Sequence, residues 1–370
     1  MITTQGAAMR RMHTTILATG LAAAAIPAVG AGAMVYVTAP RSITTPSQVM
    51  VANDNGTGAR AIARGQSAAI SPDGTKVAYQ AVSSSTDTGW SGFVVEPATG
   101  ARTALGSACV TTPVWSPDSQ WLACQTQSAN AKGFVTGNGL GLVSVPASLA
   151  GVATLPVADY VAAKGNAVDY GMAFSPDSSR IAFSFSSYPP PIDGGTLLVA
   201  PLSNSGAHTR VMTRASSPVW GDSGIAVARS RRVRVSLGGP PMRLIRTQVW
   251  TVQPDGTGAR QITRYSATGL TTGPYPVAWA PAGNLLLGAI GGEDQSDPIT
   301  ISVPGGGIRV LRRGAIDVPA AISADGHRVL YTAGMDGPPV NIRVIGTRGG
   351  TPRTLVRNAS GPSVTAGWNG

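Results

Sequence analysis

The sequence predicts an all-β fold, and three observations indicate this class: the composition, the abundance of turn formers and an internal repeat. Hydrophobic residues make up 43% of the 370 positions, and charged residues make up only 12%. The chain also contains 47 glycines and 28 prolines, which favour turns and interrupt helices. Many short strands joined by turns are therefore expected, and few helices.

The N-terminal segment has the pattern of an export signal. Arg10 and Arg11 precede an uncharged run from Thr14 to Ala39, as in the basic and apolar parts of a signal peptide. The small residues Ala31-Gly32-Ala33 end the apolar part, so we expect residues 1–33 to be removed and the mature chain to begin at Met34. The run is also long enough to cross a bilayer, so an uncleaved anchor helix that reaches about residue 39 is the alternative.

One phrase recurs along the rest of the chain: a short apolar strand, a turn built on Asp and a second apolar strand. Clear copies are Ile70–Tyr79, Trp115–Cys124 and Phe174–Phe183, and degenerate copies are Trp220–Val227, Trp279–Leu287 and Ile322–Tyr331. In such a turn Pro fixes φ, Asp accepts hydrogen bonds from the next backbone amides, and Gly takes the positive-φ position. The turn aspartates are therefore predicted to be structural: Asp73, Asp118, Asp177, Asp222 and Asp325.

A second hairpin follows the repeated phrase, most clearly at Val249–Thr263, with a similar segment at Val49–Ile62. Each unit then has four antiparallel strands, which we call A to D in chain order. Units of about 45 to 60 residues with four strands are typical of β-propeller blades. The expected architecture is a single β-propeller domain over residues 34–370.

The repeated phrase resembles the WD40-like repeat of the TolB-like propeller family, over nearly all of the chain after the signal. The resemblance implies a propeller fold. It also implies a role like that of family members, which bind protein partners in the cell envelope or form gating domains ahead of a serine peptidase. The chain departs from TolB in lacking a separate N-terminal α/β domain, and from the peptidases in ending at Gly370 without a hydrolase domain.

The number of blades depends on the two ends of the chain. Six complete units run from about Ala68 to Val356, which alone would give six blades. The segment Met34–Thr38 resembles a strand B, residues 49–63 supply strands C and D, and Ser363–Gly370 resembles a strand A entering its turn. Joining both ends in one blade would remove open sheet edges, so we expect seven blades, with six as the alternative.

The connections between strands predict which face binds a partner. The A–B and C–D turns are short and regular, whereas the B–C and D–A connections are long and variable. In up-and-down blades these two sets of connections emerge on opposite faces. We call the face of the A–B and C–D turns the regular face and the face of the B–C and D–A connections the irregular face. Loops on a rigid scaffold concentrate binding residues, and aromatic and Arg side chains are typical interface anchors. The candidate binding residues on the irregular face are Trp90, Tyr160, Tyr170, Tyr188, Arg229, Arg231, Arg232, Arg234, Arg246, Tyr265 and Tyr275.

The net charge of +11 comes almost wholly from arginine, because the chain has only three lysines. Most arginines are scattered, as codon bias would produce, and only Arg229–Arg234 is a cluster. A basic surface can attract nucleic acid or another anionic partner. Nucleic acid fits an exported chain badly, so an envelope protein or an anionic envelope component is the expected partner.

The two cysteines predict one disulfide. Pairing strands A and B about the Asp118 turn puts Cys124 opposite Thr112, and Cys109 then ends near the same rim. An oxidising compartment would allow the bond to form. Two cysteines without a flanking histidine do not predict a zinc site.

No motif predicts catalysis. Gly221-Asp222-Ser223-Gly224 resembles the nucleophile region of a trypsin-like protease, but it occupies the position of an A–B turn. General acid–base chemistry usually relies on His or paired carboxylates, and the histidines beyond the signal, His208 and His327, fall in turns of the regular face. We therefore expect no metal or cofactor.

The functional expectation is a monomeric, non-catalytic propeller outside the cytoplasm, in the cell envelope or secreted. It would bind its partner through the B–C and D–A connections and touch the membrane only through the N-terminal segment. The alternative is a propeller enzyme, a lyase or a hydrolase with a site in the central channel.

Overall fold

The computed structural model describes most of the chain from residue 32 onward. The described residues are 32–38, 47–65, 67–82, 90–105, 109, 111, 113–132, 134–162, 164–168, 171–189, 191, 193–236, 238–291, 296–313, 316–334 and 340–369. The predicted signal peptide therefore lies outside the described residues, apart from its last two positions. The alternative anchor helix would reach about residue 39, but Ala33–Thr38 form a β-strand. No helix within the described ranges has the length and apolar character needed to span a membrane.

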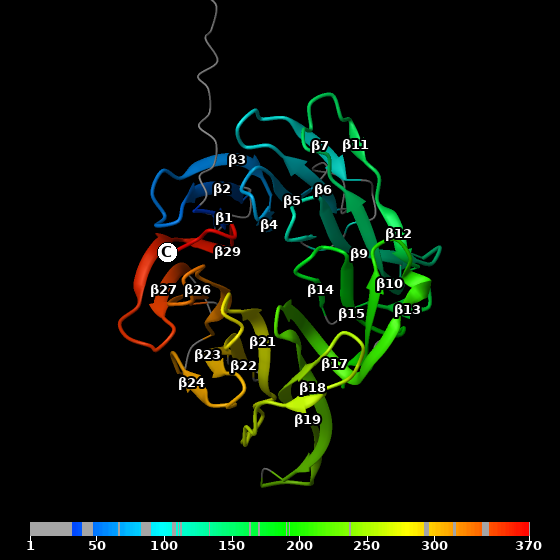
Figure 1. The fold of residues 1–370 in the computed structure, drawn as a ribbon, viewed down its shortest axis with the longest axis vertical. Coiled ribbons are helices and arrows are strands. Elements are labelled where there is room, and N and C mark those ends of the chain that lie inside the picture. Colours follow the sequence, from blue (N-terminus) through cyan, green and yellow to red (C-terminus); the bar gives the residue numbers. More distant parts are fainter. Residues whose placement is uncertain are drawn as a thin grey trace, which may run out of the picture.

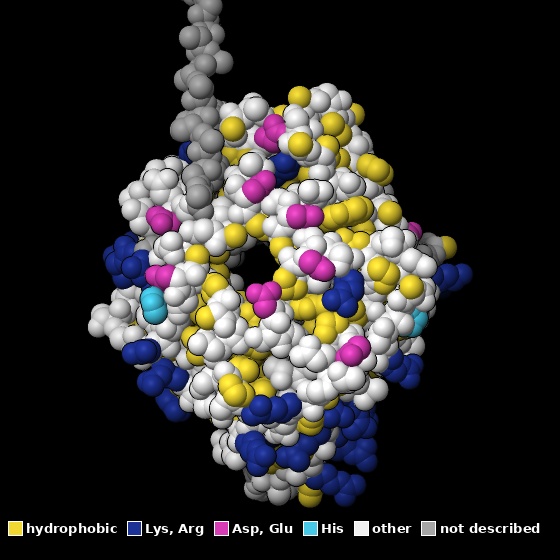
Figure 2. Space-filling model, viewed as in Figure 1, with side chains coloured by type: hydrophobic (Ala, Val, Ile, Leu, Met, Phe, Trp, Pro, Cys, Tyr) yellow, Lys and Arg dark blue, Asp and Glu magenta, His cyan; other side chains and the backbone are white. Residues whose placement is uncertain are grey.

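The described chain is almost entirely β, and its sheets surround an opening (Figures 1 and 2). The first groups of strands are β4 (Ser67–Ile70), β5 (Val77–Val82), β6 (Trp90–Val95) and β7 (Arg102–Leu105); β8 (Val114–Trp115), β9 (Trp121–Ala129), β10 (Val135–Ser144) and β12 (Ala158–Val161); and β14 (Met172–Phe174), β15 (Arg180–Ser187), β16 (Gly195–Pro201) and β17 (Thr209–Gly221). Each group is antiparallel and follows chain order.

The later groups repeat this plan. They are β18 (Gly224–Val235), β19 (Met242–Val252) and β20 (Arg260–Gln261), which continue from β17; β21 (Gly273–Trp279), β22 (Leu285–Gly291), β23 (Ser296–Ser302) and β24 (Ile308–Val310); and β25 (Val318–Ile322), β26 (Arg328–Ala333), β27 (Asn341–Gly346) and β28 (Arg353–Arg357). Short additions are β11 (Thr154–Leu155), which pairs in parallel with β7, and the 3-10 helix Ser205–Ala207. A further short strand, β13 (Asn166–Ala167), pairs in parallel with β10 and antiparallel with β15.

Strand β17 belongs to two groups at once. Its first half pairs with β16, from Thr209 to Ala215, and its second half pairs with β18, up to Gly221. The register shifts between Ser216 and Val219, where the strand passes from one group to the next. This continuity, together with β13, joins three groups into one twelve-stranded sheet.

The two ends of the described chain close the ring in one four-stranded sheet. The last strand, β29 (Ala359–Val364), pairs with β1 (Ala33–Thr38), which pairs with β2 (Gln48–Asn53) and then with β3 (Arg60–Arg64). The buried Trp368 donates from its indole Nε1 to the carbonyl oxygen of Asp54 at 3.0 Å. The predicted pairing of the two ends is therefore confirmed.

The A–B turns are held by a Ser–Asp pair that spans one intervening residue. The serine Oγ donates to the carboxylate of the aspartate and accepts from the amide five residues further on; the pairs are Ser71 with Asp73, Ser116 with Asp118, Ser175 with Asp177, and Ser323 with Asp325. At the remaining predicted turn, the residue two positions before Asp222 is Trp220, so this turn has no serine for such a pair. These contacts give the predicted turn aspartates their structural role where the serine is present.

Neighbouring A–B turns also contact each other. The amide of Asp73 donates to Ser119 Oγ of the next turn at 3.2 Å, and the amide of Asp118 donates to Ser178 Oγ at 3.1 Å. Both serines have positive φ, 62° and 56°. The regular face is therefore a chain of turns that bond to one another.

Apolar side chains fill the spaces between adjacent groups. In one of these layers, Ile225 and Val227 of β18 pack with Leu197 and Val199 of the preceding group, and all four are buried. The alternate residues of β18 face the following group, where Ala226 joins another buried cluster. This alternation follows from the two-residue period of a strand, and it buries both faces of the inner strands.

A disulfide joins Cys109 to Cys124, with their Cα atoms 5.4 Å apart. Both residues are buried in the apolar cluster that contains Trp115 and Leu122. The bond thus ties the entry of one strand A to the middle of its strand B.

The carboxylate of Asp177 makes the folding stability depend on pH in the acidic range. The Ser175 hydroxyl and the backbone and side chain of Ser179 donate to it and lower its pKa from 3.8 to about 2. A lowered folded pKa stabilises the fold above about pH 4, and this contribution is lost as the pH falls through about 2.

We expect urea unfolding at pH 5, 3 and 2 to show a smaller acid-dependent loss in Asp177→Asn than in the unmodified protein, because asparagine keeps the acceptor oxygen but does not titrate. Asp159→Asn, at an exposed position of strand β12, is the matched control. Identical pH profiles for Asp177→Asn and the unmodified protein would contradict the assignment.

Reduction of the disulfide should lower the free energy of unfolding by about 3 kcal/mol, because the bond closes a loop of 15 residues in the unfolded chain. Guanidinium unfolding with and without a thiol reductant measures this change. The double variant Cys109→Ala/Cys124→Ala should be insensitive to the reductant. A reductant effect that persists in the double variant would show that the loss has another origin.

Candidate functional site

The β18–β19 hairpin carries the densest positive charge in the sequence. Residues 224–252 contain six arginines and no aspartate or glutamate. In the strand register, Arg231 lies opposite Arg246 and Arg234 lies opposite Arg243. Like charges directly opposite each other destabilise a sheet. Figure 1 shows the hairpin extending outward from the ring, and Figure 2 shows Lys and Arg side chains gathered over it.

A cleft of about 420 Å³ lies at the base of this hairpin, and we call it the arginine cleft. It is lined by Arg214, Arg229, Ser230, Arg231, Gln248, Trp250, Gln261, Arg264, Tyr265 and Ser266. Four of these residues are arginines and none is acidic. The cleft combines positive charge with amide, hydroxyl and aromatic groups.

Strand geometry sets one wall of the arginine cleft. Arg229 and Arg231 are two residues apart on β18, so their side chains leave the same face of the sheet. On the neighbouring strand, Trp250 presents its ring to the Arg229 guanidinium, whose Cζ lies 4.7 Å from the ring centroid. This stacking contact holds the guanidinium in place while leaving its N–H groups free to donate.

Gln248 forms hydrogen bonds to the segment that makes the opposite wall of the cleft. Its Oε1 accepts from the Tyr265 amide at 2.8 Å, and its Nε2 donates to the Tyr265 carbonyl at 2.7 Å. Thr263 Oγ1 donates to the same Oε1 at 2.8 Å. These bonds attach the segment after β20, which carries Arg264, to the middle of β19.

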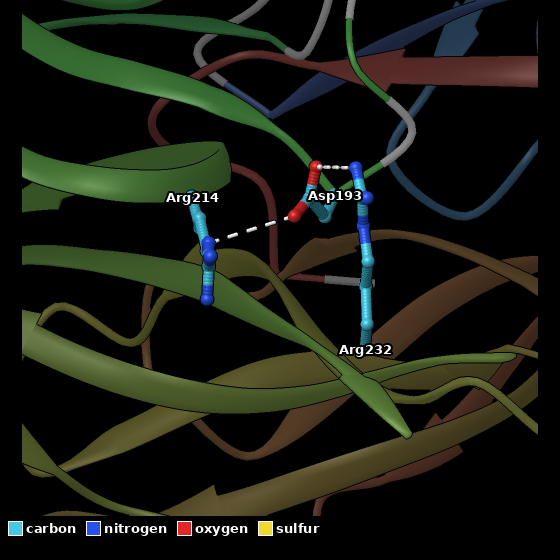
Figure 3. A network of polar contacts seen from close by, with 3 residues as sticks. All are labelled: Asp193, Arg214 and Arg232. Atoms are coloured by element: carbon cyan, nitrogen blue, oxygen red, sulfur yellow. Dashed lines mark hydrogen bonds and ion pairs between the residues drawn. The ribbon is translucent and has the colours of Figure 1, made fainter. Parts of the chain in front are cut away.

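One carboxylate, Asp193, contacts an arginine of the cleft, Arg214, and a second arginine, Arg232, as Figure 3 shows. Asp193, from the connection between β15 and β16, accepts from Arg232 at 3.1 Å and lies 3.5 Å from the Nε of Arg214. Asp193 is 6% exposed. Within the described part of the chain, no carboxylate forms an ion pair with Arg229, Arg231 or Arg264.

The structure divides the predicted arginines among different roles. Arg229 and Arg231 line the cleft, and Arg232 pairs with Asp193. Arg234 is exposed further along the hairpin. Arg246, in contrast, is 7% exposed and donates to the carbonyl oxygens of Thr271 and Gly269, so it holds the connection between β20 and β21.

The predicted aromatic residues are dispersed. Tyr265 lines the arginine cleft, whereas Tyr275 on β21 and Tyr188 after β15 are half-buried elsewhere. Trp90 is the first residue of β6, and its side chain is not among those described. Tyr170 lies outside the described residues.

Tyr160 lines a second cavity of about 480 Å³. Its hydroxyl donates to the Pro201 carbonyl at 2.5 Å, and its ring meets Phe183 edge to face with centroids 6.4 Å apart. Burial raises the pKa of Tyr160 to about 12. With its hydroxyl engaged by the backbone, Tyr160 contributes an aromatic wall to this cavity.

Sequence reasoning missed Arg214, Arg264, Gln248 and Trp250. A signal for the two arginines was present, because Met212-Thr213-Arg214 and Ile262-Thr263-Arg264 occupy the same place at the ends of successive D strands. Equivalent positions of neighbouring units lie side by side in a ring. The two arginines could therefore have been placed at one boundary between units.

The chemistry of the arginine cleft favours an anion. Guanidinium groups bind carboxylates and phosphates through paired hydrogen bonds, and three of the four lack an ion-paired carboxylate within the described residues. No group of three His, Cys, Asp or Glu side chains able to hold a metal ion occurs in the described part of the chain.

Comparison with solved structures shows a TolB-like propeller fold. TolB from Acinetobacter baumannii aligns with 92% of this chain and 68% of its own, at 16% identity and a TM-score of 0.54. An oligogalacturonate lyase in complex with manganese aligns with 88% of this chain and 85% of its own, at 14% identity and a TM-score of 0.57. The periplasmic gluconolactonase of Pseudomonas aeruginosa aligns over 90% and 99%, at 14% identity and a TM-score of 0.56.

No family model matches the sequence, and no curated protein matches it. The structural neighbours therefore establish the fold, and the function must be argued from the residues.

Proposed function

We propose that this chain is a non-catalytic β-propeller that acts outside the cytoplasm and binds an anionic envelope component in the arginine cleft. The observation that carries the proposal is a cleft lined by four arginines and no acidic residue. Its volume accommodates one or two anionic groups of a larger molecule. The cleft lies on the irregular face, at the boundary between two groups of strands.

The unfavourable placement of the arginines supports a binding role. Arg231 faces Arg246 across the strands, and folding brings Arg214 and Arg264 to the same cleft. Their mutual repulsion weakens the fold locally, and a bound anion would relieve it. Such local costs are characteristic of functional sites.

We further infer that the propeller has seven blades. When β17 is divided where its pairing changes from β16 to β18, the strands fall into six consecutive groups of four. The sheet β29-β1-β2-β3 adds the seventh. We expect the mature chain to begin near the start of β1 and to act as a monomer.

A propeller enzyme is the competing function, because two of the neighbours are named as a lyase and a gluconolactonase. Oligogalacturonate and gluconolactone are therefore the substrates to assay first. Turnover by the purified protein that survives loss of the cleft arginines would place the function elsewhere, in the central channel.

The direct test measures binding of tripolyphosphate and of oligogalacturonate by calorimetry at low ionic strength. We expect Arg229→Gln/Arg231→Gln to weaken binding by about tenfold or more, because each charge-assisted hydrogen bond contributes about 1.5–3 kcal/mol. Added salt should weaken binding in the unmodified protein. Arg309→Gln, at an exposed position of strand β24, is the control for a general loss of positive charge. Absence of binding to both probes, or an equal loss in Arg309→Gln, would contradict the proposal.

Asp193→Asn should increase anion affinity, because it releases Arg214 and Arg232 from their carboxylate partner while keeping a hydrogen-bond acceptor. The expected gain for tripolyphosphate is about threefold to tenfold, close to the effect of one charge about 4 Å away in bulk water, about 1 kcal/mol. The melting temperature of the variant reports whether the fold is retained. Weaker binding by a folded Asp193→Asn variant would show that Asp193 orients the arginines instead of competing with the ligand.

A further inference from the structure

The tip of the β18–β19 hairpin carries apolar side chains that lie beyond the arginine cleft. Val233 pairs with Leu244 and Val235 pairs with Met242 across the two strands. Met242 is 43% exposed, and none of the four belongs to or packs against a core cluster of the described chain. The tip therefore presents an apolar stripe that the rest of the described fold does not cover.

Exposed large apolar side chains elsewhere lie mostly toward the same face, each on a different connection or strand end. They belong to B–C or D–A connections or the adjoining strand ends: Phe134 at 67%, Val135 at 37%, Leu270 at 43% and Val318 at 38% exposed. The exception among the described residues is Val114, two residues before the Ser116 turn. The apolar surface is thus concentrated on the irregular face.

The charged side chains also differ between the two faces. The Ser–Asp turns place exposed carboxylates on the regular face, and Figure 2 shows acidic side chains spread around the opening. At the hairpin tip, the exposed Arg234 and Arg243 lie opposite each other, on the other face of the hairpin from the apolar stripe. Lys132 is exposed beside Phe134 at the end of the β9–β10 hairpin.

We propose that the irregular face docks onto an anionic lipid surface, with the β18–β19 tip entering the interface. Met242, Leu244 and the paired valines would lie at the acyl boundary, and Arg234 and Arg243 would lie among the headgroups. An apolar face opposite a basic face is the pattern of interfacial membrane segments, and basic clusters are attracted to anionic leaflets. A lipid surface supplies both an apolar layer and the negative charge that offsets the Arg234–Arg243 repulsion.

This docking is separate from the function proposed for the arginine cleft, because the tip residues do not line it. It also extends membrane contact beyond the N-terminal segment predicted from the sequence. Because the N-terminal segment could itself bind vesicles, the test requires a readout local to the tip.

The experiment uses the full chain with a single environment-sensitive fluorophore on Ser236→Cys, at the hairpin tip. The control carries the same label on Ala98→Cys, in an exposed turn between β6 and β7 on the opposite face. Vesicles of phosphatidylcholine with or without phosphatidylglycerol are added at low and high salt. We expect a blue shift only at position 236, only with phosphatidylglycerol, and one that salt diminishes.

Variants then separate apolar insertion from charge. In the labelled protein, Met242→Ser/Leu244→Ser and Arg234→Gln/Arg243→Gln should each raise the lipid concentration needed for half the shift by about tenfold. Neither pair lines the cleft, so tripolyphosphate binding by Met242→Ser/Leu244→Ser should be unchanged, which distinguishes failure of the docking from failure of the cleft. No shift at position 236, an equal shift at position 98, or an equal response to phosphatidylcholine alone would overturn the proposal. So would a response of the tip label to an envelope protein but not to vesicles.

Discussion

The hydrogen bond from a serine hydroxyl to an aspartate carboxylate two residues later organises the regular face of this protein. It closes the hairpin between strands A and B and directs the next backbone amides toward the same oxygen atoms. In doing so it orients the amides of Asp73 and Asp118 toward serines of the following turns. The bonds within each turn and the bonds between turns therefore share the same residues, and the opposite ends of the strands are left free to vary.

The connections of the irregular face vary in length and in sequence. The β18–β19 hairpin can hold opposed arginines at its outer end because its inner end is buried, with Ile225 opposite Val252. Asp193 balances part of the charge from a neighbouring connection, and Arg246 is turned into a structural residue by two backbone carbonyls. The positive charge that has no partner is confined to the arginine cleft and to the tip of the β18–β19 hairpin, where a ligand or a surface can reach it.

The repeats made most of the fold predictable, because turn chemistry and strand length are local properties. The pairing of the chain ends was also predictable, since the N-terminal part supplies only three strands of a four-stranded unit and the C-terminal segment supplies one more. The continuity of β17 was not, because it depends on a bulge near Ser217 with no distinct sequence signal. The arginine cluster Arg229–Arg234 indicated where the site lies. The burial of Arg246 and the stacking of Arg229 on Trp250 could not be predicted, because they depend on contacts between strands and loops that form only in the folded ring.

The sheet that joins β29 to β1 also determines when the molecule can finish folding. The outer three strands of that sheet are made first, but their inner neighbour is among the last segments to be synthesised. Until residues 359–364 are available, β1 keeps an open edge and the first and last groups have no contact through this sheet. The ring can therefore close only after nearly the whole chain has been synthesised. Such a delay would benefit a protein that must pass through a narrow pore before it folds.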